Sequence, residues 1–188
     1  LRMGGLGYNS TTQKNLNVCY NSLDNYVETL TAAIMQSHPG YQDIPAGQNG
    51  DFQQLSDSLL QIENEFYSPI RPKRVANSGE APLCALVRAG IAYIEVRCVD
   101  ISPFSPVGLD AQQMRFLDTF LLYCLLEESP PCDDDEQAIQ AGNFEAVVGS
   151  GRQPGLQLNN GTDMVSLDQW ARELLGAMQP IATLLDTA

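Results

Sequence analysis

Residues 61–74 read Gln61-Ile62-Glu63-Asn64-Glu65-Phe66-Tyr67-Ser68-Pro69-Ile70-Arg71-Pro72-Lys73-Arg74, and residues 94–97 read Ile94-Glu95-Val96-Arg97. The chain has a formal net charge of −13, yet half of its ten basic residues lie between residues 71 and 97. They are Arg71, Lys73, Arg74, Arg88 and Arg97, interleaved with Glu63, Glu65 and Glu95. Carboxylates that hold divalent cations, beside cations that bind phosphoryl oxygens, are typical of a phosphate-plus-metal site. The alternative interpretation is a solvated turn and a surface ion pair.

Two segments of this region have the composition of β-strands, residues 59–70 and residues 91–99. The connection between them contains a turn signal at Ser78-Gly79, which favours an antiparallel pair. Side chains alternate between the two faces of a strand. Alternation therefore predicts two polar faces, formed in the first strand by Glu63 and Glu65 and in the second by Tyr93, Glu95 and Arg97.

Helices are predicted on either side of these strands. Apolar spacing favours one helix over residues 21–36 and another over residues 111–127, where Asp110 and Gln113 form a capping box and a wide apolar stripe implies burial on more than one side. A third helix is expected to start near Ser166 and to be interrupted at Pro180. The composition of residues 38–54 predicts a loop, and the run of acidic residues at 133–136 predicts a solvated turn. Together these elements indicate an α+β fold, a mostly antiparallel sheet covered by helices.

Length and composition restrict the classes of function. The chain has 188 residues, and its sequence shows neither a transmembrane stretch nor a signal peptide, so we expect a cytoplasmic protein that does not bind membranes. Its acidic charge argues against nucleic acid as a partner. The five cysteines form no zinc-binding pattern and are expected to be free and mostly buried. No nucleotide-binding loop motif occurs, so any nucleotide must bind in another way.

Three blocks of the sequence resemble the C-terminal half of the proteobacterial type of glutamate-cysteine ligase. They are residues 61–74, residues 91–101 (Ile91-Ala92-Tyr93-Ile94-Glu95-Val96-Arg97-Cys98-Val99-Asp100-Ile101) and residues 102–108 (Ser102-Pro103-Phe104-Ser105-Pro106-Val107-Gly108). Shorter similarities occur in residues 1–8, 112–118 and 151–156, in the same order along the chain. The segment from residue 127 to residue 148 is similar only loosely.

The resemblance implies a glutamine-synthetase-like catalytic fold and an ATP-dependent ligation of the glutamate γ-carboxylate to cysteine, through a γ-glutamyl phosphate, as the first step of glutathione synthesis. It implies that Glu95 is a ligand of the divalent cations, Mg²⁺ or Mn²⁺, and that Arg97 contacts the transferred phosphoryl group. It further implies that Arg2, Tyr8 and Tyr67 line the pocket for cysteine. The resemblance assigns no individual role to Glu63, Glu65, Arg71, Lys73 or Arg74.

Most of the metal-binding carboxylates of this family lie in an N-terminal half that the chain lacks. We therefore expect residues 1–188 to be a fragment of a larger single catalytic domain, inactive alone and prone to self-association through exposed apolar surface. Two alternatives remain open from the residues. One is a non-catalytic module that binds an anion or a partner, and the other is a different carboxylate-amine ligase.

Overall fold

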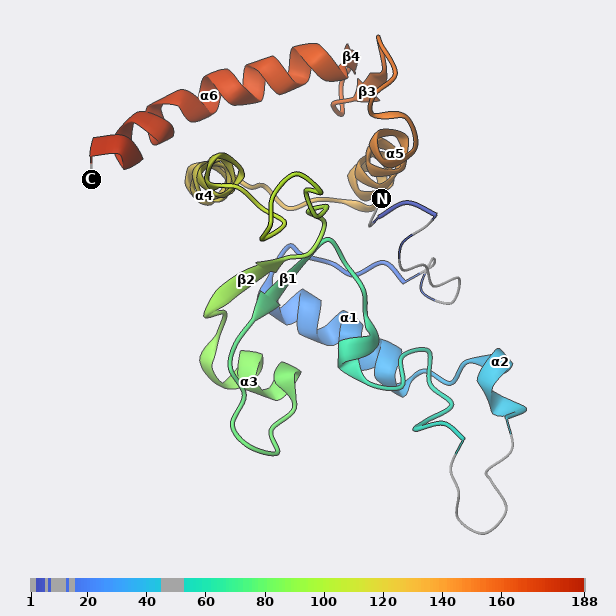
Figure 1. Ribbon diagram of the computed structural model, residues 1–188. Helices are drawn as coiled ribbons and strands as arrows, with labels where there is room; N and C mark the ends of the chain where they lie inside the picture. Colours follow the sequence, from blue (N-terminus) through green and yellow to red (C-terminus); the bar gives the residue numbers. More distant parts are fainter. Residues whose placement is uncertain (1–2, 6, 8–12, 14–15, 45–52, 188) are drawn as a thin grey trace. The chain divides into compact units, whose positions relative to one another are not determined.

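The computed structural model describes residues 3–5, 7, 13, 16–44 and 53–187 (Figure 1). The chain divides into two compact units, Arg2–Val99 and the segment from Asp100 to the C-terminus. Each unit has its own helices and its own two-stranded antiparallel sheet. No helix among the described residues is both long and apolar enough to cross a membrane.

The first unit is built around helix α1 (Leu23–Met35). The hydroxyl of Ser22 caps this helix by accepting a hydrogen bond of 3.0 Å from the Asn25 backbone N–H. The predicted helix over residues 21–36 is confirmed. Two short elements follow it, α2 (Pro39–Gln42) and the 3₁₀ helix η2 (Glu63–Glu65), and α2 lies in the segment predicted to be a loop. The apolar face of α1 packs into a core formed by Val18, Tyr26, Leu30, Ala33, Leu60, Phe66, Leu83 and Leu86.

Strands β1 (Ile70–Lys73) and β2 (Tyr93–Val96) form an antiparallel pair, as expected, but the first strand was predicted too early: of residues 59–70, only Ile70 belongs to β1. Their connection is more than a turn, because it contains helix α3 (Pro82–Ala89), which the sequence analysis did not predict. Pro82 occupies the first turn of α3, where its missing N–H costs nothing, and Gly90 ends the helix at a φ of 71°.

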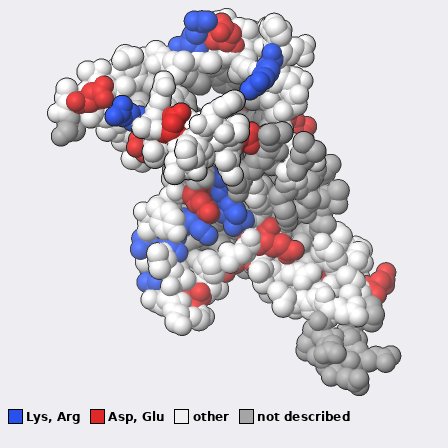
Figure 2. All heavy atoms as spheres, in the orientation of Figure 1, with Lys and Arg blue, Asp and Glu red and all other residues white. Residues whose placement is uncertain are grey.

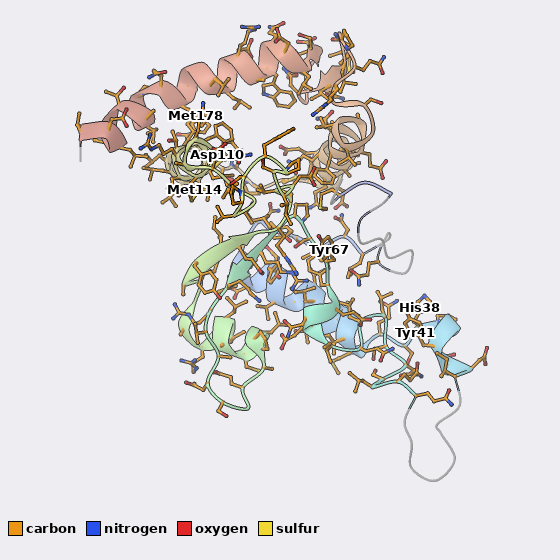
Figure 3. All side chains as sticks on the ribbon, in the orientation of Figure 1. His38, Tyr41, Tyr67, Asp110, Met114 and Met178 are labelled. Atoms are coloured by element: carbon orange, nitrogen blue, oxygen red, sulfur yellow. The ribbon has the colours of Figure 1, made fainter. Side chains whose placement is uncertain are left out.

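The second unit contains α4 (Ala111–Leu126), α5 (Asp134–Ser150) and α6 (Leu167–Thr187), with β3 (Gln157–Asn159) paired to β4 (Met164–Ser166). The capping box of α4 is confirmed: Asp110 accepts from the Gln113 N–H at 2.8 Å, and the Gln113 side chain accepts from the Asp110 N–H at 3.0 Å. Helices α4 and α6 pack together, with Met178 of α6 buried (Figure 3).

Three predictions for this unit are wrong. The acidic run is not a turn: Asp133 caps α5 and the next three acidic residues form its first turn, where they complement the helix dipole. Pro180 does not interrupt α6, which continues through it. Within α4, Thr119 alone is buried, although burial on more than one side was expected.

The α+β class is confirmed, and both strand pairs are antiparallel. The expectation of buried cysteines is wrong. All five are free as expected, but Cys84, Cys98 and Cys124 are exposed, and Cys19 and Cys132 are half-buried.

Candidate functional site

The register of β1 and β2 places three functional side chains on one face of the hairpin. Arg71 lies directly opposite Glu95, and Lys73 lies opposite Tyr93. Directly opposite residues share a face, and so do residues two apart on one strand. Arg71, Lys73 and Glu95 therefore project to the same side. Arg97 follows β2 on this side and is held by a 2.7 Å hydrogen bond from its N–H to the Pro69 carbonyl.

Glu95 lies between two cations. Its Oε2 is 3.9 Å from Lys73 Nζ, and its Oε1 is 3.9 Å from Arg97 Nε. The Glu95 side chain is 39% exposed, against 27% for Lys73 and 25% for Arg97. This partly covered environment strengthens charge interactions relative to open water. In Figure 2 basic and acidic side chains gather over β1 and β2.

Tyr67 packs against the Arg97 guanidinium. The Arg97 guanidinium carbon lies 5.1 Å from the centroid of the Tyr67 ring, a cation–π contact. The Tyr67 backbone N–H donates to the Gln13 side chain at 3.1 Å, and the Gln13 amide donates to the Glu65 carbonyl at 2.9 Å. Figure 3 shows Tyr67 beside the hairpin. The structure thus brings together three of the predicted site residues, Tyr67, Glu95 and Arg97.

Gln13 is a residue that sequence reasoning missed. From a segment more than fifty residues earlier in the chain, its side-chain amide bridges the Glu65 carbonyl and the Tyr67 N–H. A lone glutamine in a polar segment carries no local signal for such a bridge. The predicted residues Arg2 and Tyr8 lie near it in the sequence but outside the residues that the structure describes.

Arg71 is the buried cation of the site, at 6% exposure. Its guanidinium packs against the Phe66 ring at 5.8 Å and donates to the Asn64 carbonyl at 3.4 Å. Burial lowers the pKa of Arg71, and the positive charge of Arg97 lowers it further. Among the described residues, none accepts a hydrogen bond from its buried Nε. Arg71 is therefore a buried positive charge on the same hairpin face as the partly exposed Glu95.

Glu63 and Glu65 do not form the strand face that the sequence predicted. They lie in η2, where one carboxylate accepts from the Leu83 N–H at 2.7 Å and the other from the Gln61 N–H at 2.7 Å. Glu63 thereby caps the N-terminus of α3. Burial raises the pKa of Glu63, while the Leu83 N–H and Lys73 oppose that rise. Both glutamates therefore use their carboxylates to accept hydrogen bonds from backbone N–H groups.

Two of the five basic residues are also used elsewhere. Arg74 Nε donates a hydrogen bond to the Gly90 carbonyl at the end of α3. Arg88 forms a bidentate pair with Glu80, at 2.7 and 3.0 Å, and this pair lowers the pKa of Glu80 to about 2. The cation cluster is therefore smaller than the sequence indicated.

The donor set tests whether a divalent cation fits here. Mg²⁺ takes one or two carboxylates together with waters and substrate phosphates. Glu95 is partly exposed and accepts no hydrogen bond in the described part of the chain, so one of its oxygens is available to a cation. No group of three or more His, Cys, Asp or Glu side chains among the described residues is placed to hold a metal. The site therefore fits a cation that takes a single ligand from this chain.

Comparison with known proteins connects this geometry to a family. A sequence profile for glutamate-cysteine ligase matches residues 1–147. Glutamate–cysteine ligase of Pseudomonas putida is 48% identical over 188 residues, and that of Shewanella oneidensis is 50% identical over 186 residues. These matches cover 100% and 99% of this chain but 36% of each relative. The chain thus spans about a third of the length of these curated relatives.

A solved structure agrees with these sequence matches. The crystal structure of glutamate–cysteine ligase from Francisella tularensis in complex with AMP superposes with a TM-score of 0.89 at 36% identity. The superposition covers 97% of this chain and 37% of that one. It confirms the α+β, glutamine-synthetase-like fold that the resemblance implied.

Proposed function

The chain belongs to the glutamate-cysteine ligase family, and from this premise we propose that the full-length protein uses ATP to join the γ-carboxylate of glutamate to the amino group of cysteine. The observation that carries the proposal is the Glu95 carboxylate with Lys73 and Arg97 at 3.9 Å on a partly covered hairpin face. The crystal structure of the Francisella tularensis relative contains AMP, which supports a nucleotide substrate. We further propose that the protein works in the cytoplasm, where ATP is available.

The reaction has two steps. A γ-carboxylate oxygen of glutamate attacks the terminal phosphorus of ATP, and the bond to ADP breaks, which gives γ-glutamyl phosphate. The amine of cysteine then attacks the acyl carbon, phosphate leaves, and the amine loses a proton as the amide forms. Negative charge concentrates on the phosphoryl oxygens in the first step, so a preorganised cation is needed there.

We assign Arg97 to this phosphoryl group and Glu95 to the divalent cation. A Mg²⁺ or Mn²⁺ ion held in part by Glu95 would neutralise phosphate charge when bound. The Tyr67 ring holds the Arg97 guanidinium in one orientation, which suits a transition state that needs aligned donors. We assign Tyr67, together with Arg2 and Tyr8, to the cysteine pocket. Because this chain supplies one carboxylate for the cation, we expect residues 1–188 to be inactive alone.

The test measures ADP release by the full-length protein with glutamate, cysteine and magnesium each omitted in turn. We expect ADP release to require all three. Glu95→Gln should lower kcat by at least about 100-fold, since one preorganised electrostatic group contributes roughly 3 kcal/mol. Glu28→Gln, an exposed change on α1 of the same unit, is the matched control and should leave kcat unchanged.

Two outcomes would contradict the proposal in different ways. If ADP release proceeds equally well with another amine in place of cysteine, the protein is a different carboxylate-amine ligase. If the wild-type protein releases no ADP with any amine, the anion-binding module becomes the better interpretation. A fully active Glu95→Gln enzyme would keep the ligase assignment but remove the metal role from Glu95.

A further inference from the structure

Lys73 is a charged residue of the site to which the family resemblance gives no role. It lies at the end of β1 opposite Tyr93, and Glu95 is its diagonal neighbour on the same face, two residues further along β2. Its ammonium reaches back along the hairpin face to 3.9 Å from Glu95 Oε2. Arg97 approaches the other oxygen of the same carboxylate at 3.9 Å. The two cations therefore flank Glu95 on one partly covered surface.

The distances show that neither Lys73 nor Arg97 forms a hydrogen bond with Glu95. A charge-assisted N–H···O bond is about 2.7–2.9 Å long, so 3.9 Å is an ion pair without a hydrogen bond. No other described residue accepts a hydrogen bond from Lys73 Nζ, although its side chain is 27% exposed. An ammonium group has three donors. The donors of Lys73 are therefore available to a ligand on the open side of the hairpin.

The other basic residues of this region show what a structural cation looks like here. Arg74 bonds the Gly90 carbonyl, Arg88 holds Glu80 in a bidentate pair, and buried Arg71 contacts Asn64 and Phe66. Each of the three is bonded to the protein itself. Lys73 differs from them, and it shares this difference with the neighbouring Arg97, whose side chain forms a long ion pair and a ring contact.

The local charge balance favours an anion. Arg71, Lys73 and Arg97 contribute three positive charges, and Glu63 and Glu95 contribute two negative ones when ionised. The chain as a whole has a net charge of −13, so this local excess of positive charge creates a positive electrostatic potential that attracts a phosphate to this face. An ion that binds to Glu95 would reduce the negative charge there and increase this excess.

We propose that Lys73 is a second phosphoryl-binding residue, which contacts the β- or γ-phosphate of ATP while Arg97 contacts the transferred group. The proposal rests on the proposed function and extends it by one residue. Lys73 and Arg97 would approach the phosphate chain from opposite sides of Glu95. Lys73 supplies a point charge with rotatable donors, and Arg97 supplies a planar fork held by Tyr67.

The test uses full-length protein and two measurements. The first is calorimetric binding, with magnesium, of the non-hydrolysable analogue β,γ-imido-ATP and of AMP, which lacks both outer phosphates. Lys73→Gln should weaken binding of the analogue by at least about tenfold and leave AMP affinity unchanged. The second is kcat for ADP release, which Lys73→Gln should lower by at least about tenfold and Lys73→Arg should largely restore. Arg88→Gln, which removes a cation outside the site, should change neither measurement.

Each remaining outcome has one meaning. If Lys73→Gln lowers the affinities for the analogue and for AMP equally, or lowers neither, Lys73 does not read the outer phosphates and the proposal is wrong. If Lys73→Gln lowers only thermal stability, Lys73 is a structural partner of Glu95 and the proposal is likewise wrong. Failure of the ligase assignment itself is seen separately, as wild-type protein that needs no cysteine for ADP release.

Discussion

Glu95 and Arg97 reach one face because they are two residues apart in an extended segment. This rule requires only that the segment be a strand, so the sequence was sufficient to place these two residues together. The same rule failed for Glu63 and Glu65, because their segment forms a 3₁₀ turn. There Glu65 accepts from the Gln61 N–H and Glu63 from the Leu83 N–H. Side-chain capping by carboxylates competes with strand pairing, and the sequence period does not show which one prevails.

Tyr26 links a residue of the core to the pH dependence of stability. Burial raises the pKa of Tyr26 to about 12, and the neighbouring Tyr20 adds to the rise. A pKa that is higher in the folded state means that the unfolded chain releases this proton first. The stabilisation is complete below a pH of about 10 and is lost as the pH rises toward 12, with a slope of up to about 1.4 kcal/mol per pH unit.

We therefore expect Tyr26→Phe to flatten the alkaline fall in stability. The measurement is the free energy of unfolding in urea at pH 8.5 and pH 11 for the full-length wild-type and variant proteins. Tyr93→Phe, at a tyrosine that is 49% exposed, is the control and should behave as wild type. Curves for Tyr26→Phe that run parallel to wild type would show that Tyr26 does not couple folding to pH.

At the scale of elements, the capping box of α4 is a local device with a measurable energy. Asp110 and Gln113 satisfy each other's backbone N–H groups. Asp110→Ala should cost about 1 kcal/mol of helix stability, and Gln113→Ala should cost less. Because the two bonds act as one unit, the double variant should lose less than the sum of the single losses. Hydrogen exchange of the first-turn amides of α4 measures each loss, and strictly additive losses would contradict this coupling.

Elements with strong local signals were predictable, and elements whose formation depends on neighbours were not. Helices α1 and α4 have an apolar period and a cap in the sequence, and both occur nearly where predicted. Helix α3 has eight residues, too few for a clear period, and its start depends on a carboxylate from η2. Helix α5 has no buried residue, and its few apolar side chains are mixed with small and polar ones, so its sequence has no clear apolar stripe to detect.

Pro180 illustrates a different limit of sequence reasoning. Proline inside a helix removes one backbone hydrogen bond and crowds the carbonyl four residues earlier, which here belongs to Gly176. The sequence therefore predicted an interruption. Helix α6 nonetheless continues to Thr187. Its amphipathic face packs against α4, and tertiary packing of this kind outweighs a local propensity.

At the scale of the whole molecule, much apolar surface is exposed. Phe104 is 96% exposed, Val107 83% and Leu125 78%, all in the second unit. In the first unit, a pocket of about 340 Å³ opens on the hairpin face opposite the site, lined by side chains that include Tyr20, Pro72 and Ile94. Apolar surface of this extent is characteristic of segments that are covered by other parts of a protein.

We expect the isolated chain of 188 residues to self-associate through this surface. Multi-angle light scattering should give an average mass that rises with concentration and exceeds the 20.5 kDa of one chain. Phe104→Ser combined with Leu125→Ser should lower that mass, whereas Glu128→Gln, an exposed polar change, should not. A mass of one chain at all concentrations would contradict the expectation.

The outer edge of β1 determines where the hairpin sheet can grow. Arg97 and Pro69 are a hydrogen-bonded pair, so by alternation the backbone groups of Ile70 and Pro72 face away from β2. Pro72 has no N–H to offer there, and the Ile70 carbonyl already accepts from the hydroxyls of Tyr20, at 3.1 Å, and Ser68, at 2.6 Å. A further strand would find few backbone hydrogen-bonding groups beside β1. On the outer edge of β2, by contrast, every residue has both an N–H and a C=O group. We therefore expect the sheet to accept an additional strand at the edge of β2 and not at the edge of β1.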